Sequence, residues 1–173
     1  MRRSLICVGV ILLFAQLGVI AFRRLDERTP KGPRVGALLP DHSVRRLSGE
    51  RLAFRATLSG GCHLVVFIST TCPVCKDMRM TWWNKFVSWR DSLNIAIEPL
   101  WVFWEPEELV NGFFQGIYRV PTVLLLGNHR KAIAKFGVFG TPLSYLVDGN
   151  QRLQAGVVGN RFPELTKYLG ACR

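Results

Sequence analysis

Two cysteines spaced as Cys72-Pro73-Val74-Cys75 are the residues best suited to chemistry in this sequence. At the start of a helix, unpaired N–H groups and the helix dipole would favour the thiolate of Cys72, the species that attacks disulfides. Cys75 follows one turn later on the same face, where it can resolve a mixed disulfide. Pro73 fits the first helical turn without losing a hydrogen bond. The spacing predicts thiol–disulfide exchange, with Cys72 as nucleophile and Cys75 as resolving thiol.

A zinc site is the alternative use of these cysteines. Cys62 and His63 lie ten residues earlier and could complete a set of four ligands. Adjacent residues rarely point at one metal, however, and the sequence has no second pair of cysteines with this spacing. Redox chemistry is therefore favoured over a zinc-stabilised structural domain. Neither a metal nor a bound cofactor is expected, because the dithiol itself carries two electrons.

The other three cysteines have no such pattern. Cys62 and Cys172 could pair in an oxidising compartment, and each could equally be a free thiol. Cys7 lies in an apolar N-terminal segment and is interpreted as a small hydrophobic residue.

A buried strand followed by a helix is predicted to position the cysteine pair. The run Leu64–Ile68 is continuously apolar, as in a central strand covered on both faces. After the cysteines a helical pattern continues to about residue 90, with Trp82, Phe86 and Trp89 on one face for core packing.

Strands and helices alternate along the rest of the chain. Hairpins are predicted at 43–47 with 51–54 and at 143–147 with 153–158, with single strands at 95–103 and 120–126. Helices are predicted from 105–108, at 130–136 and at 162–169; Glu105, Glu107 and Glu108 are interpreted as helix-start residues. This order predicts an α/β fold with a central mixed sheet flanked by helices and an N-terminal hairpin.

The N-terminal segment is predicted to be a membrane anchor. Residues 4–22 carry no charged side chain, and as a helix they would be roughly 29 Å long, against a ~30 Å hydrocarbon core. A cleaved signal peptide is the alternative. We therefore expect residues 1–24 to be an anchor or signal-anchor, 25–36 a linker and 37–173 a single domain.

The net charge of +11 does not indicate a nucleic-acid-binding protein. Residues 1–34 hold seven basic and two acidic side chains, so much of the surplus flanks the apolar segment, where it can meet lipid headgroups. No run of Lys and Arg interleaved with aromatic residues is present. Five basic residues directly after the apolar segment would favour a cytoplasmic domain by the positive-inside rule.

From about Arg34 onward the chain resembles the membrane-anchored TlpA/ResA-like thiol–disulfide oxidoreductases of the thioredoxin fold. The resemblance rests on the N-terminal hairpin, the apolar strand leading to Cys72-Pro73-Val74-Cys75, and Gly140-Thr141-Pro142 ahead of the last hairpin. It implies that Pro142 is cis, that Thr141 offers backbone groups to a substrate strand, and that Pro73 also contacts substrate.

Within that fold, two segments are similar to the accessory protein family of methylamine utilisation, MauD. They are Phe67 to Lys76 and Gly156 to Arg161. This resemblance implies a periplasmic domain on a single-pass anchor in the cytoplasmic membrane, acting on the cysteine-rich small subunit of methylamine dehydrogenase. The expected partners are an exported cysteine-containing client, an integral-membrane redox partner and membrane lipid.

Three departures from the thioredoxin pattern bear on function. Thr71 replaces the usual Trp before the first cysteine, Val66 the buried acid of thioredoxins, and Met78 the Glu of reductive cytochrome-maturation relatives. They weaken a cytochrome c maturation reductase role and leave oxidase or isomerase action open. A non-catalytic, chaperone-like accessory module for one client is a further alternative.

Overall fold

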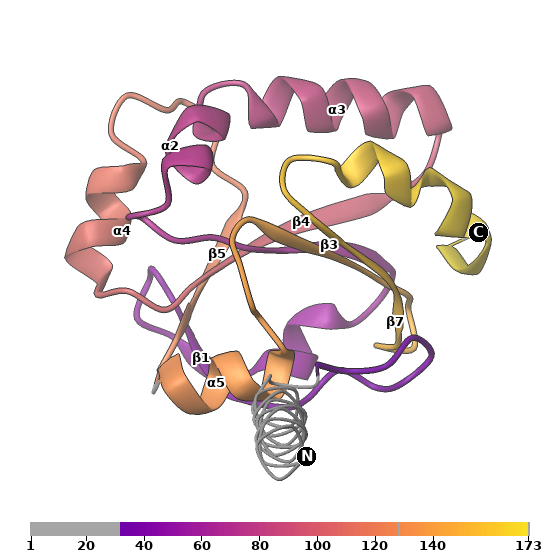
Figure 1. The fold of residues 1–173 in the computed structure, drawn as a ribbon, viewed down its shortest axis with the longest axis horizontal. Coiled ribbons are helices and arrows are strands. Elements are labelled where there is room, and N and C mark those ends of the chain that lie inside the picture. The colour runs from indigo at the N-terminus through magenta and orange to yellow at the C-terminus, as the bar shows by residue number, and fades with distance from the viewer. Residues whose placement is uncertain (1–31, 128, 173) are drawn as a thin grey trace, which may run out of the picture. The chain divides into compact units, whose positions relative to one another are not determined.

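The computed structural model describes residues 32–127 and 129–172, which form a seven-stranded mixed sheet with helices on both faces (Figure 1). The strand order is β2-β1-β5-β4-β3-β6-β7. β3 pairs in parallel with β4, and β4 with β5, whereas the other neighbours are antiparallel. The strands are β1 (Ser43–Arg46), β2 (Arg51–Ala53), β3 (Cys62–Phe67), β4 (Ile97–Phe103), β5 (Thr122–Leu126), β6 (Leu143–Val147) and β7 (Leu153–Val158).

The helices divide between the two faces of the sheet (Figure 1). One face is covered by α2 (Pro73–Arg79), α3 (Trp82–Leu93), α4 (Glu107–Phe113) and the 3₁₀ helix η2 (Phe162–Cys172). The other face is covered by α5 (His129–Phe136) and the 3₁₀ helix η1 (Phe54–Leu58). Each face therefore has its own apolar core, and the predicted mixed α/β sheet is confirmed.

The central strand β3 contributes to both cores. Leu64 and Val66 pack beneath α2 and α3, while Val65 and Phe67 point to the opposite face. Both sets are fully buried, which explains why the strand is continuously apolar rather than alternating. β3 is therefore held between both cores, and a short loop leads from its end at Phe67 to the cysteine pair.

The helical region after the cysteines differs from the prediction because it is divided in two. The helix breaks at Met80 and Thr81, where the N–H of Thr81 donates to the carbonyl of Met78 in a tighter turn. The break redirects α3 so that Trp82, Phe86 and Trp89 face the sheet, all of them buried. The predicted apolar stripe is thus confirmed as core. The predicted closing helix is a 3₁₀ helix, η2.

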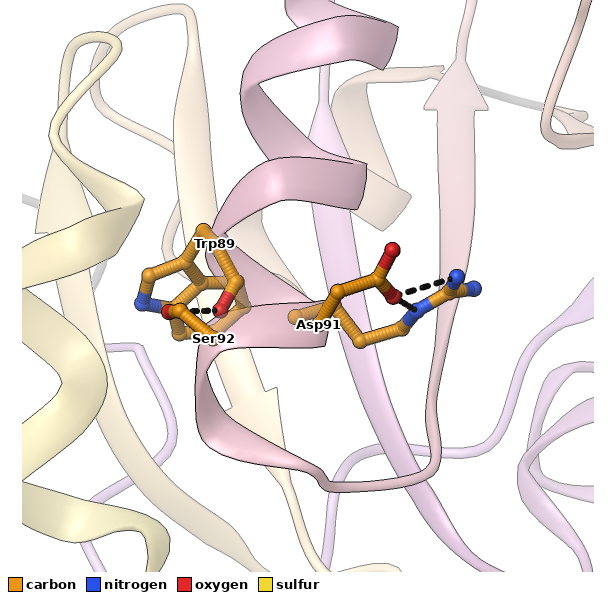
Figure 2. A network of polar contacts seen from close by, with 4 residues as sticks. Trp89, Asp91 and Ser92 are labelled. Carbon is orange, nitrogen blue, oxygen red and sulfur yellow. Dashed lines mark hydrogen bonds and ion pairs between the residues drawn. The ribbon is translucent and has the colours of Figure 1, made fainter.

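Figure 2 shows the polar contacts at the end of α3. The hydroxyl of Ser92 donates to the carbonyl of Trp89 at 2.7 Å, and Arg90 binds the carboxylate of Asp91. Asn94 then adopts a left-handed conformation with φ 50°, which ends the helix before β4.

The predicted anchor at residues 1–24 and most of the predicted linker at 25–36 lie outside the described residues. Within 32–127 and 129–172, none of the helices is long and apolar enough to cross a bilayer.

Candidate active site

Cys72 lies at the junction of β3 and α2, where the sequence predicted it. Its Sγ accepts a hydrogen bond from the N–H of Cys75 at 3.3 Å, so Cys72 is the N-cap residue of α2, and Pro73 follows at the first helical position. The N–H of Cys72 in turn donates to the carbonyl of Ser69 at 3.2 Å. The loop and the first turn of α2 therefore hold the two cysteines on one face.

The two sulfurs have different surroundings. Cys72 is partly exposed, whereas Cys75 is fully buried in the core beneath α2. Burial alone would raise the pKa of Cys72, but hydrogen bonds from the side chains of Cys75 and Thr141 and from backbone N–H groups outweigh it and lower the pKa. Burial and the neighbouring Cys72 sulfur raise the pKa of Cys75 to about 12. Cys72 is therefore the more easily ionised thiol and the one that a substrate can reach.

Thr141 and Pro142 lie beside Cys72, although they are about seventy residues away in the sequence. The peptide bond between them is cis, as the resemblance implied. The carbonyl oxygen of Thr141 accepts a hydrogen bond from Cys72 Sγ at 3.2 Å, and the carbonyl of Pro142 accepts one from Gly159 N–H at 2.7 Å. Because β6 pairs with β3, this loop is brought to the same end of the sheet as the cysteines.

Glu105 supports the cysteine loop, a role that sequence reasoning missed. Its carboxylate accepts hydrogen bonds from the N–H of Thr70 at 3.0 Å and from the N–H of Trp104 at 3.3 Å. The interpretation of Glu105 as a helix-start residue is wrong, because α4 begins at Glu107. No local pattern could have indicated the contact, which joins the ends of β3 and β4 across 35 residues.

Among residues 32–127 and 129–172, no carboxylate lies buried beneath the cysteines. Val66 and Met78, at the positions where relatives carry acids, are both buried in the apolar core that surrounds Cys75. The one buried acid among the described residues is Asp148, which follows β6 and binds the N–H groups of Asn150 and Arg152. Within the described part of the chain, no buried acidic side chain therefore lies beside the thiol of Cys75 to accept its proton.

The pairing left open by the sequence is settled by a disulfide between Cys62 and Cys172. Since the sulfur of Cys62 is bonded to that of Cys172, it is not a thiolate available to a metal. Among the residues that the structure describes, His, Cys, Asp and Glu form no group of three or more that could hold a metal ion.

Comparisons with known proteins match the fold of this chain to solved structures. No protein-family model matches the sequence, and no curated protein matches it. The thioredoxin domain of a thiol-disulfide oxidoreductase from Bacteroides vulgatus aligns with 15% identity and a TM-score of 0.64, covering 79% of this chain and 99% of that one.

Two further solved structures share the fold. A thiol:disulfide interchange protein, DsbE, from Chlorobium tepidum aligns with 18% identity and a TM-score of 0.61, over 79% of this chain and 93% of the other. A thiol peroxidase from Chromobacterium violaceum aligns with 15% identity and a TM-score of 0.61, over 80% and 87%. The chain therefore has a thioredoxin-like fold.

Proposed function

We propose that the protein is a thiol–disulfide oxidoreductase with Cys72 as its nucleophile. The observation that carries this proposal is the asymmetric pair, with a reachable thiol of lowered pKa beside a buried thiol of raised pKa. A thiolate at the surface can attack or leave a disulfide, and a second thiol within reach can complete the exchange. Thr141 and Pro142 border Cys72 and would receive the backbone of a substrate strand.

We propose that exchange runs in the oxidising direction. A client thiolate attacks Sγ of Cys72 in the Cys72–Cys75 disulfide, and Cys75 leaves and takes up a proton. A second client thiolate then attacks the client sulfur of the mixed disulfide, and Cys72 leaves as a thiolate. The client loses two electrons and the protein gains them. The lowered pKa of Cys72 supports this direction, because stabilising the thiolate stabilises the reduced protein.

Each cycle leaves two electrons on the Cys72–Cys75 dithiol. A partner must therefore accept these electrons and restore the disulfide before the next cycle. We propose an integral-membrane electron acceptor, reached through a tether formed by residues 1–24. A tether raises the effective concentration of the domain near membrane partners. A C-terminal reporter fusion tests the topology, and activity of a cytoplasmic reporter would contradict the periplasmic location.

An exported location is supported by the Cys62–Cys172 pair, because disulfides persist mainly in oxidising compartments. Among exported clients, we propose maturation of methylamine dehydrogenase on the strength of the two segments similar to MauD, Phe67 to Lys76 and Gly156 to Arg161. Loss of disulfides from the dehydrogenase small subunit in a strain lacking this protein is the expected result.

Trapping experiments test the reaction itself. Cys75→Ser is expected to accumulate mixed disulfides with clients, because no second thiol remains to resolve them, whereas Cys72→Ser forms none. An accessory module without catalysis would support client maturation with both substitutions in place. Full-length protein in mild detergent, separated on non-reducing gels, distinguishes these outcomes.

A further inference from the structure

A surface depression leads away from the cysteine loop between α2 and α4. Its near part is a cavity of about 550 Å³ that begins at Thr71, the residue before Cys72, and is lined by Lys76 and Leu109 on its two walls. Its far part is a cavity of about 220 Å³. Arg79 lines both cavities, which makes them neighbours, and we call them together the α2–α4 groove.

The far cavity lies where the chain after α4 passes beside α2 on its way to β5 (Figure 1). Met80 from the break between α2 and α3 and Trp83 from the first turn of α3 line this cavity, together with Tyr118 and Arg119 from the connecting segment. The indole N–H of Trp83 is buried and has no hydrogen-bond partner among the described residues. Trp83 and Met80 therefore give this cavity an apolar wall.

Exposed apolar side chains border the groove. Met80 is 60% exposed, Leu109 53%, and Tyr118 is fully exposed. Isolated apolar side chains on a surface need no explanation, but a group of them around neighbouring cavities is typical of an interaction site.

The charge of the groove is mainly positive. Lys76, Arg79 and Arg119 line it, against one acid, Glu108. None of the three bases is in an ion pair within the described part of the chain, where the five ion pairs all involve other arginines. Arg79 donates to the carbonyl of Phe113 at 2.6 Å and lies over its ring, so its guanidinium is held in place while other N–H groups stay available.

We propose that the α2–α4 groove is a client-binding site for an acidic segment that also carries an apolar side chain. This inference rests on the proposed function, because the groove starts beside Cys72. Carboxylates of the client would pair with Lys76, Arg79 and Arg119, while the apolar side chain packs against Trp83. The groove selects clients by the residues near their cysteine rather than by the cysteine itself.

Rates of a single thiol-exchange step test the site. Full-length Cys75→Ser protein reacts with peptides whose one cysteine is blocked as a pyridyl disulfide. Attack by the Cys72 thiolate forms the protein–peptide disulfide and releases thiopyridone, which absorbs light. One peptide carries two glutamates and a leucine on each side of the cysteine; in the others lysine replaces glutamate or glycine replaces leucine. Neutral dipyridyl disulfide measures the reactivity of Cys72 without a peptide, and every variant also carries Cys7→Ser because Cys7 is the remaining cysteine outside the Cys62–Cys172 pair.

The acidic, leucine-containing peptide is expected to react about tenfold faster than its lysine counterpart at low salt, and the advantage should shrink as salt is added. Arg119→Glu should reduce the ratio of peptide rate to dipyridyl rate about threefold to fivefold. Tyr118→Ala should reduce only the advantage of leucine over glycine. Lys131→Glu is the matched control, because it reverses the charge of an exposed residue on α5, which covers the opposite face of the sheet. This variant should keep every ratio of rates.

Two kinds of failure are distinguishable. Equal rates for all peptides, with normal reaction of dipyridyl disulfide, would overturn the groove and leave the proposed function intact. If the Cys75→Ser protein, which retains Cys72, failed to react with dipyridyl disulfide, this would instead contradict the proposed function. An equal effect of Lys131→Glu and Arg119→Glu would show that net charge, rather than the groove, determines the rate.

Discussion

The two cysteine pairs of this protein lie at opposite ends of β3 and have opposite characters. Cys62 opens the strand, is almost completely buried and is bonded to Cys172, 110 residues away. Cys72 and Cys75 follow the other end of the strand, lie three residues apart and are thiols. The same residue type thus serves as a cross-link at one end and as a redox site at the other.

The surroundings explain the difference. Hydrogen bonds and partial exposure make Cys72 a better thiolate, and the cis Thr141–Pro142 loop borders it. At the other end, the bond joins the start of β3 to the end of η2, and burial of Cys62 hinders attack on its sulfur by an external thiol, although Cys172 is only partly buried. Access and thiolate stability, rather than the presence of cysteine, separate a reactive pair from an inert one.

The largest expected effect comes from Cys72→Ser. A serine hydroxyl is a far weaker nucleophile than a thiolate, so the rate of disulfide exchange with a dithiol peptide should fall at least about 1000-fold. The variant with both Cys62 and Cys172 changed to alanine is the matched control and should keep its rate at a temperature where it stays folded. A comparable loss in that control would remove the distinction between the pairs.

Removal of the cross-link should instead affect stability. In the chain-entropy account, opening a loop of this length costs about 4 to 5 kcal/mol of unfolding free energy. We expect that loss for the double alanine variant in urea titrations monitored by circular dichroism. Cys72→Ala with Cys75→Ala should change stability much less, because these thiols close no long loop. An unchanged urea midpoint for the variant that lacks Cys62 and Cys172 would contradict a structural role of this disulfide.

Alkylation as a function of pH sharpens the contrast within the site. Because its pKa is lowered, Cys72 should react with iodoacetamide well below the pH at which a free thiol does. Cys75, with its pKa raised to about 12, should stay protected up to strongly alkaline pH. At pH 7 we expect Cys72 to react at least about tenfold faster, measured by mass spectrometry of each site. Equal rates would contradict the asymmetry.

The smallest expected effect concerns His63, beside the cross-linked Cys62. His63 is 2% exposed, and burial lowers its pKa despite the opposing effect of Glu98. The folded protein then binds fewer protons than the unfolded chain, so stability is present above pH 6.5 and is lost as pH falls toward the folded pKa. The slope contributed is at most about 1.4 kcal/mol per pH unit. His63→Phe should flatten the pH dependence of the urea midpoint below pH 6.5. An unchanged slope would contradict the contribution of His63 to this pH dependence.

Sequence patterns predicted the parts of the fold that depend on local order. The apolar run of β3, the cysteine spacing and the turn between β6 and β7 are each readable within a few residues. The break in the helix at Met80 and Thr81 was not predicted, because no Gly or Pro marks it in the sequence.

Contacts between segments far apart in the chain could not be predicted from the sequence either. The hydrogen bond from Thr70 to Glu105 and the bond between Cys62 and Cys172 depend on how strands are placed in the sheet. Composition and spacing carry little information about such pairings, whereas the cis bond before Pro142 was implied by family resemblance.

A redox titration that follows the four cysteines of the two pairs tests the central claim most directly. The full-length protein is equilibrated in buffers of graded potential, and each cysteine is quantified by alkylation and mass spectrometry. We predict that Cys72 and Cys75 become reduced together at the less negative potential, while Cys62 and Cys172 stay bonded until about −300 mV or below. Reduction of Cys62–Cys172 first, or of both pairs at one potential, would contradict the account.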